Sequence, residues 1–270
     1  MPATLNGTLL PGWMERDDAL DWLQQQCWFD PPLQGSQAED IWNVYRNRVE
    51  ALGTRSLPTV NRGAVAASDR QHVESFKRRF RGDPEVIDVV GVDPMNLVVY
   101  QLYVCIEKAQ EHAASHTSWC KKCLVMDRPI SRLPIRVEDG TVKITLPHAE
   151  HMLGLQPNGA FVIQQGGGFV SVVEFQGRTV LKAGYHRCFA FAQSAMKAPD
   201  ANDKFMLVAV TRSLPPPLTP MFPRQGLRAT VFGSRPPLFS DFFDSNFAMA
   251  VKLRKKRYEA HFRILAVDEP

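Results

Sequence analysis

The clearest pattern of apolar and polar positions lies between Val172 and Gln193. Apolar and polar residues alternate at its start, and Gln176-Gly177 then provides a two-residue turn signal. A second strand-like run covers Thr179 to Ala183, and Gly184 follows it. Beyond this glycine the spacing becomes helical, as shown by Phe189, Ala192, Gln193 and Met196. The pattern predicts a β-hairpin, one glycine and then a helix.

Strand-like patterns also lie on both sides of this stretch. The other expected strands are the apolar or alternating runs at residues 86–92, 97–99, 133–146 and 205–210. Asp139-Gly140 predicts that the run at 133–146 is a hairpin. A helix is expected from Glu107 to His116, after a strand that ends near Gln101.

Residues 1–80 have a helical pattern of apolar positions. After Ser36 the apolar residues form a stripe along one face of the expected helix, and they are Ile41, Trp42, Tyr45, Val49 and Leu52. The region also holds Trp13, Trp22, Trp28 and Trp42. These aromatic residues have two interpretations. They pack in a core between amphipathic helices, or they form a face that binds a protein partner, because aromatic side chains are enriched at interfaces.

Residues 214–240 are rich in proline, which excludes a regular helix or sheet there. We expect an arm that wraps over the domain or reaches a partner, then a C-terminal edge strand from Tyr258 to Val267. The segment that follows the proline-rich stretch contains four phenylalanines that are expected to be buried, with the N-terminal tryptophans as candidate neighbours. They are Phe239, Phe242, Phe243 and Phe247. The expected domains are a helical region at 1–80, a core at 81–213 with an insertion near 120–155, and the arm and strand at 214–270.

Composition limits the class of protein. The chain has 270 residues, with 44% hydrophobic and 22% charged residues and a net charge of +4, which is typical of a globular protein. The sequence contains no run of about 18 apolar residues, so no membrane span is expected, and the N-terminus does not resemble a secretory signal. Five cysteines, an odd number, favour a reducing compartment, so we expect a cytoplasmic protein without membrane contact.

Candidate chemistry first arises where the expected hairpin meets its helix. The first turn of a helix carries unpaired backbone N–H groups and the positive end of the helix dipole. Gly184, His186 and Arg187 at this place predict a phosphate site, in which the glycine permits close approach and the basic side chains clamp the anion. In the alternative interpretation, the glycine only makes the turn and the basic pair is a solvated rim.

Two further features of the sequence have weaker functional interpretations. His112, His116, Cys120 and Cys123 could converge on a zinc ion if the helix continued through them; otherwise they are surface histidines and free thiols. Basic clusters at 77–81 and 254–257 could contact DNA, although such runs are usually solvated faces.

The order strand, Gly184-Tyr185-His186-Arg187, helix and apolar strand resembles the ParB/sulfiredoxin superfamily. The resemblance covers roughly Pro84 to Arg212, interrupted by the insertion, and Gln101 matches the end of the family's first strand box. It implies an α+β fold with a ParB/sulfiredoxin-like mixed core. It also implies that Gly184, Tyr185, His186, Arg187 and Gln101 bind a nucleotide or another phosphate ligand.

The chain departs from the family in ways that limit the expected chemistry. Sulfiredoxins carry a nucleophilic cysteine where this chain has Tyr185, so sulfinic acid reduction is not expected. Partition proteins continue into a DNA-binding bundle, whereas this chain continues into a proline-rich segment. Family phosphotransferases use a carboxylate base, and Glu174 is the candidate here.

We therefore expect a protein that binds a nucleotide or phosphate ligand, with magnesium as an accompanying ion and hydrolase or phosphotransferase activity as an open question. The alternatives are a protein-interaction module without catalysis, whose pocket is vestigial, and a DNA-associated protein.

Overall fold

The computed structural model describes residues 4–81, 86–114, 118–124, 135–138, 141–146, 151–155, 161–165, 169–197, 205–212, 230–255 and 258–263. The chain divides into two compact units. Unit 1 comprises Met1–Met126 and Phe169–Arg254, and unit 2 comprises Asp127–Gly168 and Lys255–Pro270. Within the described parts, every helix is too short or too polar to cross a membrane.

Unit 1 has six α-helices, in its described parts: α1 (Arg16–Asp21), α2 (Gln37–Ala51), α3 (Arg70–Arg79), α4 (Ile106–Ala114), α5 (Trp119–Cys123) and α6 (Tyr185–Lys197). A π-helical turn follows α1 at Trp22–Gln26, and 3-10 turns lie at Pro11–Trp13, Ala67–Asp69, Pro94–Asn96 and Phe239–Phe243, the last labelled η5. Its strands are β1 (Thr4–Leu9), β2 (Cys27–Trp28), β3 (Arg62–Gly63), β4 (Val86–Val92), β5 (Tyr103–Cys105), β10 (Ser171–Phe175), β11 (Arg178–Ala183), β12 (Met206–Thr211) and β13 (Met249–Arg254).

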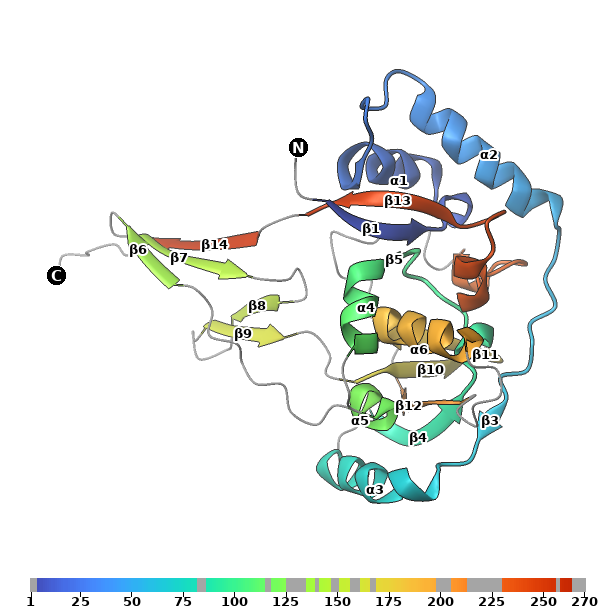
Figure 1. Cartoon of the computed structure of the whole chain (residues 1–270), viewed down its shortest axis with the longest axis vertical. Helices are drawn as coiled ribbons and strands as arrows, with labels where there is room; N and C mark the ends of the chain where they lie inside the picture. Colours follow the sequence, from blue (N-terminus) through green and yellow to red (C-terminus); the bar gives the residue numbers. More distant parts are fainter. Residues whose placement is uncertain are drawn as a thin grey trace. The chain divides into compact units, whose positions relative to one another are not determined.

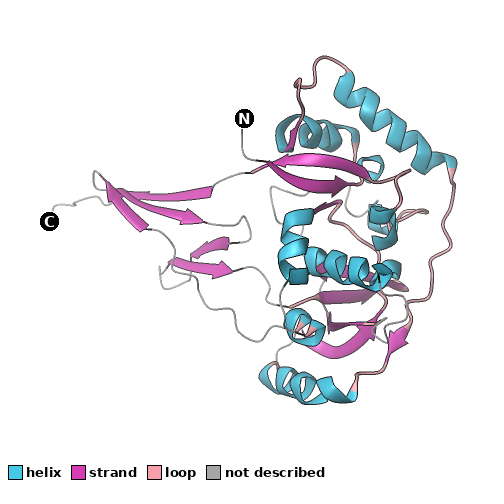
Figure 2. Cartoon of the chain, in the orientation of Figure 1, coloured by secondary structure: helices cyan, strands magenta, loops and turns pink. Residues whose placement is uncertain are grey.

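Two sheets form the framework of unit 1. Sheet A has the order β2-β13-β1-β5, and all of its neighbouring strands are antiparallel. Sheet B has the order β11-β10-β12-β4-β3, and it is mixed because β10 and β12 are parallel whereas the other pairs are antiparallel. The fold is therefore α+β, as the sequence predicts (Figure 2).

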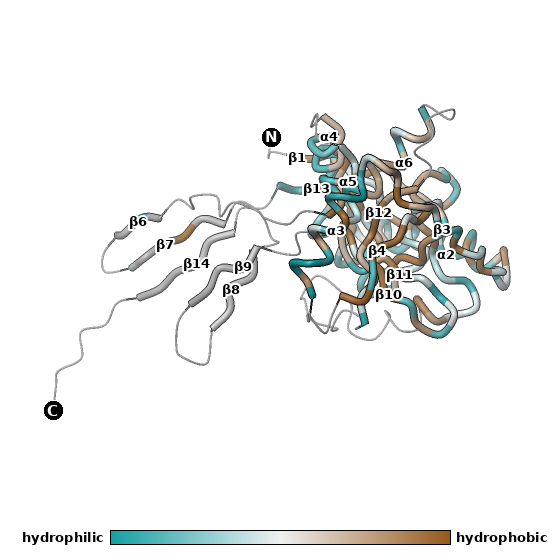
Figure 3. The backbone as a smooth tube through the Cα atoms, turned by 90° about the horizontal axis from the view of Figure 1, so that it is seen from below, coloured by the Kyte–Doolittle hydropathy of each residue, from teal (hydrophilic) through white to brown (hydrophobic). Residues whose placement is uncertain are grey.

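Helices α4 and α6 lie between the two sheets of unit 1 (Figure 1). One cluster of buried side chains joins all three layers, with members such as Leu9 of sheet A, Phe189 of α6 and Val208 of sheet B. The strands of sheet B are rich in hydrophobic residues (Figure 3), and all six residues of β12 are buried. The sequence pattern correctly predicted β12 as a central strand.

The hairpin and helix predicted from the sequence are confirmed. β10 pairs with β11 in the antiparallel register Glu174↔Thr179, and the turn residues Gln176 and Gly177 have φ angles of 50° and 71°. Positive φ at both positions matches the tight turn whose twist fits a hairpin. The helix α6 then begins at Tyr185, directly after Gly184.

The N-terminal region is not purely helical, which corrects the expectation for residues 1–80. β1 pairs along its whole length with β13, from Thr4↔Arg254 to Leu9↔Met249, and so joins the two ends of unit 1. Such pairing between distant segments is not encoded in a local pattern. Residues 230–254 of the expected arm likewise belong to unit 1, whereas the prolines at 214–220 lie outside the described residues.

The N-terminal tryptophans contribute to packing, which supports the first of their two interpretations. Trp13 is 4% exposed, and its ring centroid lies 5.5 Å from that of Phe247, one of the four phenylalanines that were expected to be buried. The Trp22 ring lies 4.4 Å from that of Tyr103, and Trp42 donates a hydrogen bond to the carbonyl oxygen of Met14. These contacts place the aromatic groups in the core or at its margin.

Unit 2 consists of short antiparallel strands. They are β6 (Ile135–Glu138), β7 (Thr141–Leu146), β8 (His151–Leu155), β9 (Phe161–Gln165) and β14 (Tyr258–Arg263). β7 pairs with β6 and with β14, and β8 pairs with β9. The predicted hairpin at 133–146 and the C-terminal edge strand are therefore present.

Candidate functional site

The start of α6 is built by a glycine that no other residue could replace without strain. Gly184 has a φ of +97°, and a Cβ atom there would lie 2.7 Å from a methyl carbon of Val170. Its carbonyl oxygen accepts the first helical hydrogen bond, from the N–H of Cys188 at 2.9 Å. Gly184 thus allows β11 to turn directly into the helix, as the sequence predicts.

The structure brings Tyr185 and Gln101 together, but through the backbone of Gln101. The hydroxyl of Tyr185 accepts hydrogen bonds from the N–H groups of Tyr100 and Gln101 at 3.1 and 3.2 Å, and donates to the carbonyl of Leu181 at 2.8 Å. The side-chain amide of Gln101 donates to the carbonyl of Tyr103. Burial raises the pKa of Tyr185 well above its usual value, so the phenol stays neutral and serves as a structural clamp.

Arg187 points inward from the same helical turn. Its residue is 4% exposed, and its guanidinium donates a hydrogen bond of 2.9 Å to the carbonyl oxygen of Lys122 in α5. This contact holds α5 against α6. His186 is partly exposed as a residue, but its Nε2 atom is buried. The amphipathic pattern of α6 did not reveal that Arg187 belongs to its buried face.

Glu174 lies at the opposite end of the hairpin. Ser171 is the residue opposite Ala183, whereas Glu174 is three residues further along β10, a distance of roughly 10 Å along a strand. A general base must come within hydrogen-bond reach of the group it activates. Glu174 and the start of α6 therefore do not form one catalytic centre in the described structure.

Glu174 instead lines a pocket of about 480 Å³, which we call the hairpin pocket. The lining residues come from β3 and the loop before it, from the segment after β4 and from the hairpin: Leu57, Pro58, Thr59, Val60, Arg62, Asn96, Val98, Glu174, Phe175, Gln176, Gly177, Arg178 and Thr179. The Nη2 atom of Arg62 forms an ion pair with Oε1 of Glu174, and the two side chains are 54% and 45% exposed. The pocket thus presents a cation and an anion side by side.

Two residues of this pocket were not predicted from the sequence as functional candidates. Arg62 lies in a stretch whose composition indicated only a loop or linker, and it is 112 positions from its partner Glu174. Arg178 fixes the pocket wall, because its guanidinium donates to the carbonyls of Val231, Phe232 and Gly233. No local pattern in the sequence links these segments.

The zinc hypothesis finds no support among the described residues. They include His112, Cys120 and Cys123, yet hold no group of three or more side chains arranged as metal ligands, and His116 lies outside them. Burial raises the pKa of the Cys120 and Cys123 thiols to about 12 in each case. A thiol must lose its proton to bind a metal or attack a disulfide, so these two groups are poorly suited to either role.

This burial leads to a prediction for thiol reactivity. All five cysteines are free and buried. At pH 8 a thiol with a pKa near 12 is ionised in roughly one molecule in ten thousand. Ellman's reagent should therefore react slowly with the native protein and with five thiols after addition of urea. A thiol that reacts within seconds in the native protein would contradict the buried assignment.

The two basic clusters make structural contacts within unit 1. Lys77 of α3 pairs with Asp88 of β4 at 2.9 Å. Arg254 donates to the carbonyls of Cys27 and Gln24, and Lys256 and Arg257 lie outside the described residues. Part of the positive charge in both clusters is thus used to hold neighbouring segments.

Comparisons of the chain with models of protein families, with curated proteins and with solved structures found no match. Inferences about function therefore depend on the geometry of the hairpin pocket and of the start of α6.

Proposed function

We propose that the chain binds a nucleotide or another small phosphate-bearing molecule, and that the hairpin pocket holds it. The observation that supports this proposal is the Arg62–Glu174 ion pair within a pocket of about 480 Å³. This volume lies in the range of sites that enclose small molecules. The ParB/sulfiredoxin resemblance supplies the expectation of a phosphate ligand, and the pocket supplies groups of suitable chemistry.

The chemistry of the pocket matches the parts of a nucleotide. A guanidinium binds phosphate oxygens through two parallel N–H donors, so Arg62 is suited to the phosphate. A carboxylate accepts hydrogen bonds from sugar hydroxyls, a role open to Glu174. The side chains of Leu57, Val60 and Phe175 provide an apolar wall for a base, and Phe175 is 39% exposed.

The ion pair need not prevent binding. Exposed salt bridges contribute only about 0–1 kcal/mol to stability. Little free energy is therefore lost when Arg62 leaves Glu174 to bind a phosphate. Glu174 is the one carboxylate among the described lining residues, which makes it a suitable oxygen ligand for a magnesium ion that accompanies the phosphates. A carboxylate in this position could also orient a water molecule, which is the route to hydrolase activity.

A thermal-shift series with ATP, ADP, CTP and GTP, each with and without magnesium, tests the proposal. A ligand at about 100 times its dissociation constant stabilises the native state by roughly 2.7 kcal/mol, which corresponds to roughly 2–4 °C for each kcal/mol. We expect such a shift in the wild type and its loss in Arg62→Ala. The matched control is Arg16→Ala, because Arg16 forms a similarly exposed pair with Glu39 outside the pocket.

The variants separate the two candidate places. A shift that persists in Arg62→Ala and disappears in His186→Ala would place the ligand at the start of α6 instead. The absence of a shift with every nucleotide would refute nucleotide binding and favour the protein-interaction alternative. If a shift is found, Glu174→Gln should retain binding and lose any turnover of the nucleotide.

A further inference from the structure

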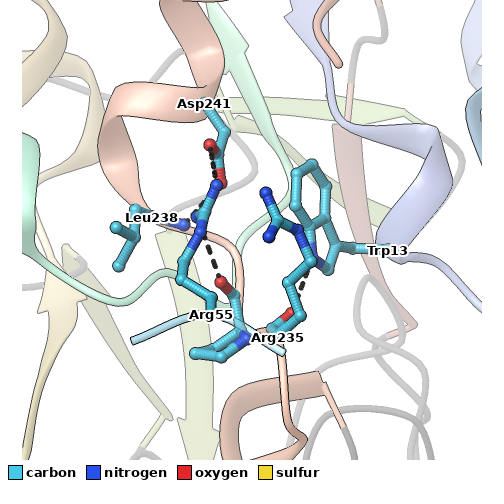
Figure 4. A network of polar contacts seen from close by, with 6 residues as sticks. Trp13, Arg55, Arg235, Leu238 and Asp241 are labelled. Atoms are coloured by element: carbon cyan, nitrogen blue, oxygen red, sulfur yellow. Dashed lines mark hydrogen bonds and ion pairs between the residues drawn. The ribbon is translucent and has the colours of Figure 1, made fainter. Parts of the chain in front are cut away.

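A second arginine lies beside an ion pair that is already complete. Arg55 donates to both carboxylate oxygens of Asp241, at 2.6 and 2.8 Å, and the N–H of Leu238 donates to the same carboxylate at 2.8 Å (Figure 4). The side chains of Arg55 and Asp241 are 14% and 5% exposed. The Asp241 carboxylate therefore already accepts three hydrogen bonds before Arg235, the second arginine, is considered.

Arg235 is held in place by its own backbone. Its carbonyl oxygen accepts a hydrogen bond of 2.9 Å from the indole N–H of Trp13, and the preceding carbonyl, of Ser234, accepts one from the N–H of Arg55. The Arg235 guanidinium lies 5.9 Å from the centroid of the Phe247 ring. The hydrogen bonds hold the backbone at Arg235, whose residue is partly buried.

The polar requirements of this side chain are not met by the described residues. The Nε atom of Arg235 is buried and has no acceptor among them, and no described carboxylate forms an ion pair with its guanidinium. A buried N–H group without an acceptor is costly, and nearly all such groups have a partner. Burial and the nearby Arg55 lower the pKa of Arg235, and the Asp241 carboxylate offsets part of this effect.

Arg235 also lines a pocket of about 350 Å³, separate from the hairpin pocket. The hydroxyl-bearing residues Thr54 and Ser234 lie on its wall, as does Arg46 of α2. Two carboxylates line it as well: Glu50, which is paired with Arg46 at 2.6 Å, and Glu15. The Arg46–Glu50 pair is neutral, so Arg235 and Glu15 determine the remaining charge.

We propose that this second pocket binds a small oxyanion, namely a phosphate or sulfate group, on the guanidinium of Arg235. An oxyanion in the pocket supplies a counter-charge for a guanidinium that lies beside Arg55, and it would bind through the Nη groups of Arg235, because the Nε atom is buried. Hydroxyl groups such as those of Thr54 and Ser234 are suitable further donors. Glu15 disfavours a polyphosphate, because its carboxylate would repel the higher negative charge of such a group.

Inorganic phosphate is the probe for this site, titrated into the full-length protein against sodium chloride at equal ionic strength. We expect a saturable rise in melting temperature of roughly 3 °C or more in the wild type, and its loss in Arg235→Gln. The matched control is Arg48→Gln, because the Arg48 guanidinium also lies over an aromatic ring, at 5.1 Å from Tyr45, but outside the pocket. The control should keep the full rise.

A second measurement keeps the test decisive if Arg235→Gln does not fold. The Nε–H resonance of Arg235 in the wild type, assigned with Arg235→Lys, should shift during the phosphate titration and saturate at the same concentration. An Nε–H signal that does not move would overturn the inference, as would an equal thermal shift in Arg235→Gln. Loss of the phosphate effect in Arg62→Ala, with Arg235→Gln unaffected, would assign the anion to the hairpin pocket and also reject this site.

Discussion

Replacement of Asp241 by alanine should lower the free energy of unfolding by about 3–5 kcal/mol, which is the usual cost of removing one partner of a buried ion pair. The carboxylate accepts two hydrogen bonds from Arg55 and one from the N–H of Leu238, and it is 5% exposed. Its removal leaves Arg55 buried without a counter-charge and beside Arg235. The change also releases η5, whose N-terminus this carboxylate caps.

Urea unfolding followed by circular dichroism measures this effect. The control is Glu39→Ala, which removes the carboxylate of the exposed pair with Arg16 and should cost less than about 1 kcal/mol. Asp241→Asn separates charge from shape, because it keeps the size of the side chain and part of the hydrogen bonding. If Asp241→Ala and Glu39→Ala had the same midpoint, the ion pair could not be an important support of the fold.

Local patterns predicted the elements that depend on neighbouring residues. The hairpin β10–β11 and α6 form within one continuous stretch, so alternation, a turn signal and helical spacing were sufficient to find them. Sheet A depends instead on β1 meeting β13 across the length of unit 1. The residues of β1 carry no turn or capping signal that points to a partner near the other end of the chain.

The candidate sites show the same division. Gly184 was found because its place between a strand and a helix is a local feature, and the structure confirms its special backbone. Arg62 and Arg235 were missed because their functional interest depends on residues more than a hundred positions away, namely Glu174 and Trp13. The inward direction of Arg187 also depends on a distant partner, the Lys122 carbonyl.

Gly184→Ala is the second substitution with a large expected effect, about 2–5 kcal/mol of lost stability. A non-glycine residue in the left-handed region costs about 1–2 kcal/mol. The new methyl group would lie 2.7 Å from a carbon of Val170, and forced packing of this kind costs about 1–3 kcal/mol more. Thermal and urea unfolding should both show the loss.

Gly35→Ala is the control that separates these two contributions. Gly35 has a φ of +53°, but a Cβ there has nothing within 4 Å, so its replacement should cost about 1 kcal/mol from the backbone alone. The double variant Gly184→Ala/Val170→Ala should be less destabilised than the sum of the single variants, by about 0.5–3 kcal/mol, because the contact has been removed. If the destabilisation of the double variant equalled the sum of the two single variants, contact with Val170 would not be a reason for glycine at position 184. The backbone conformation alone would then require glycine at the start of α6.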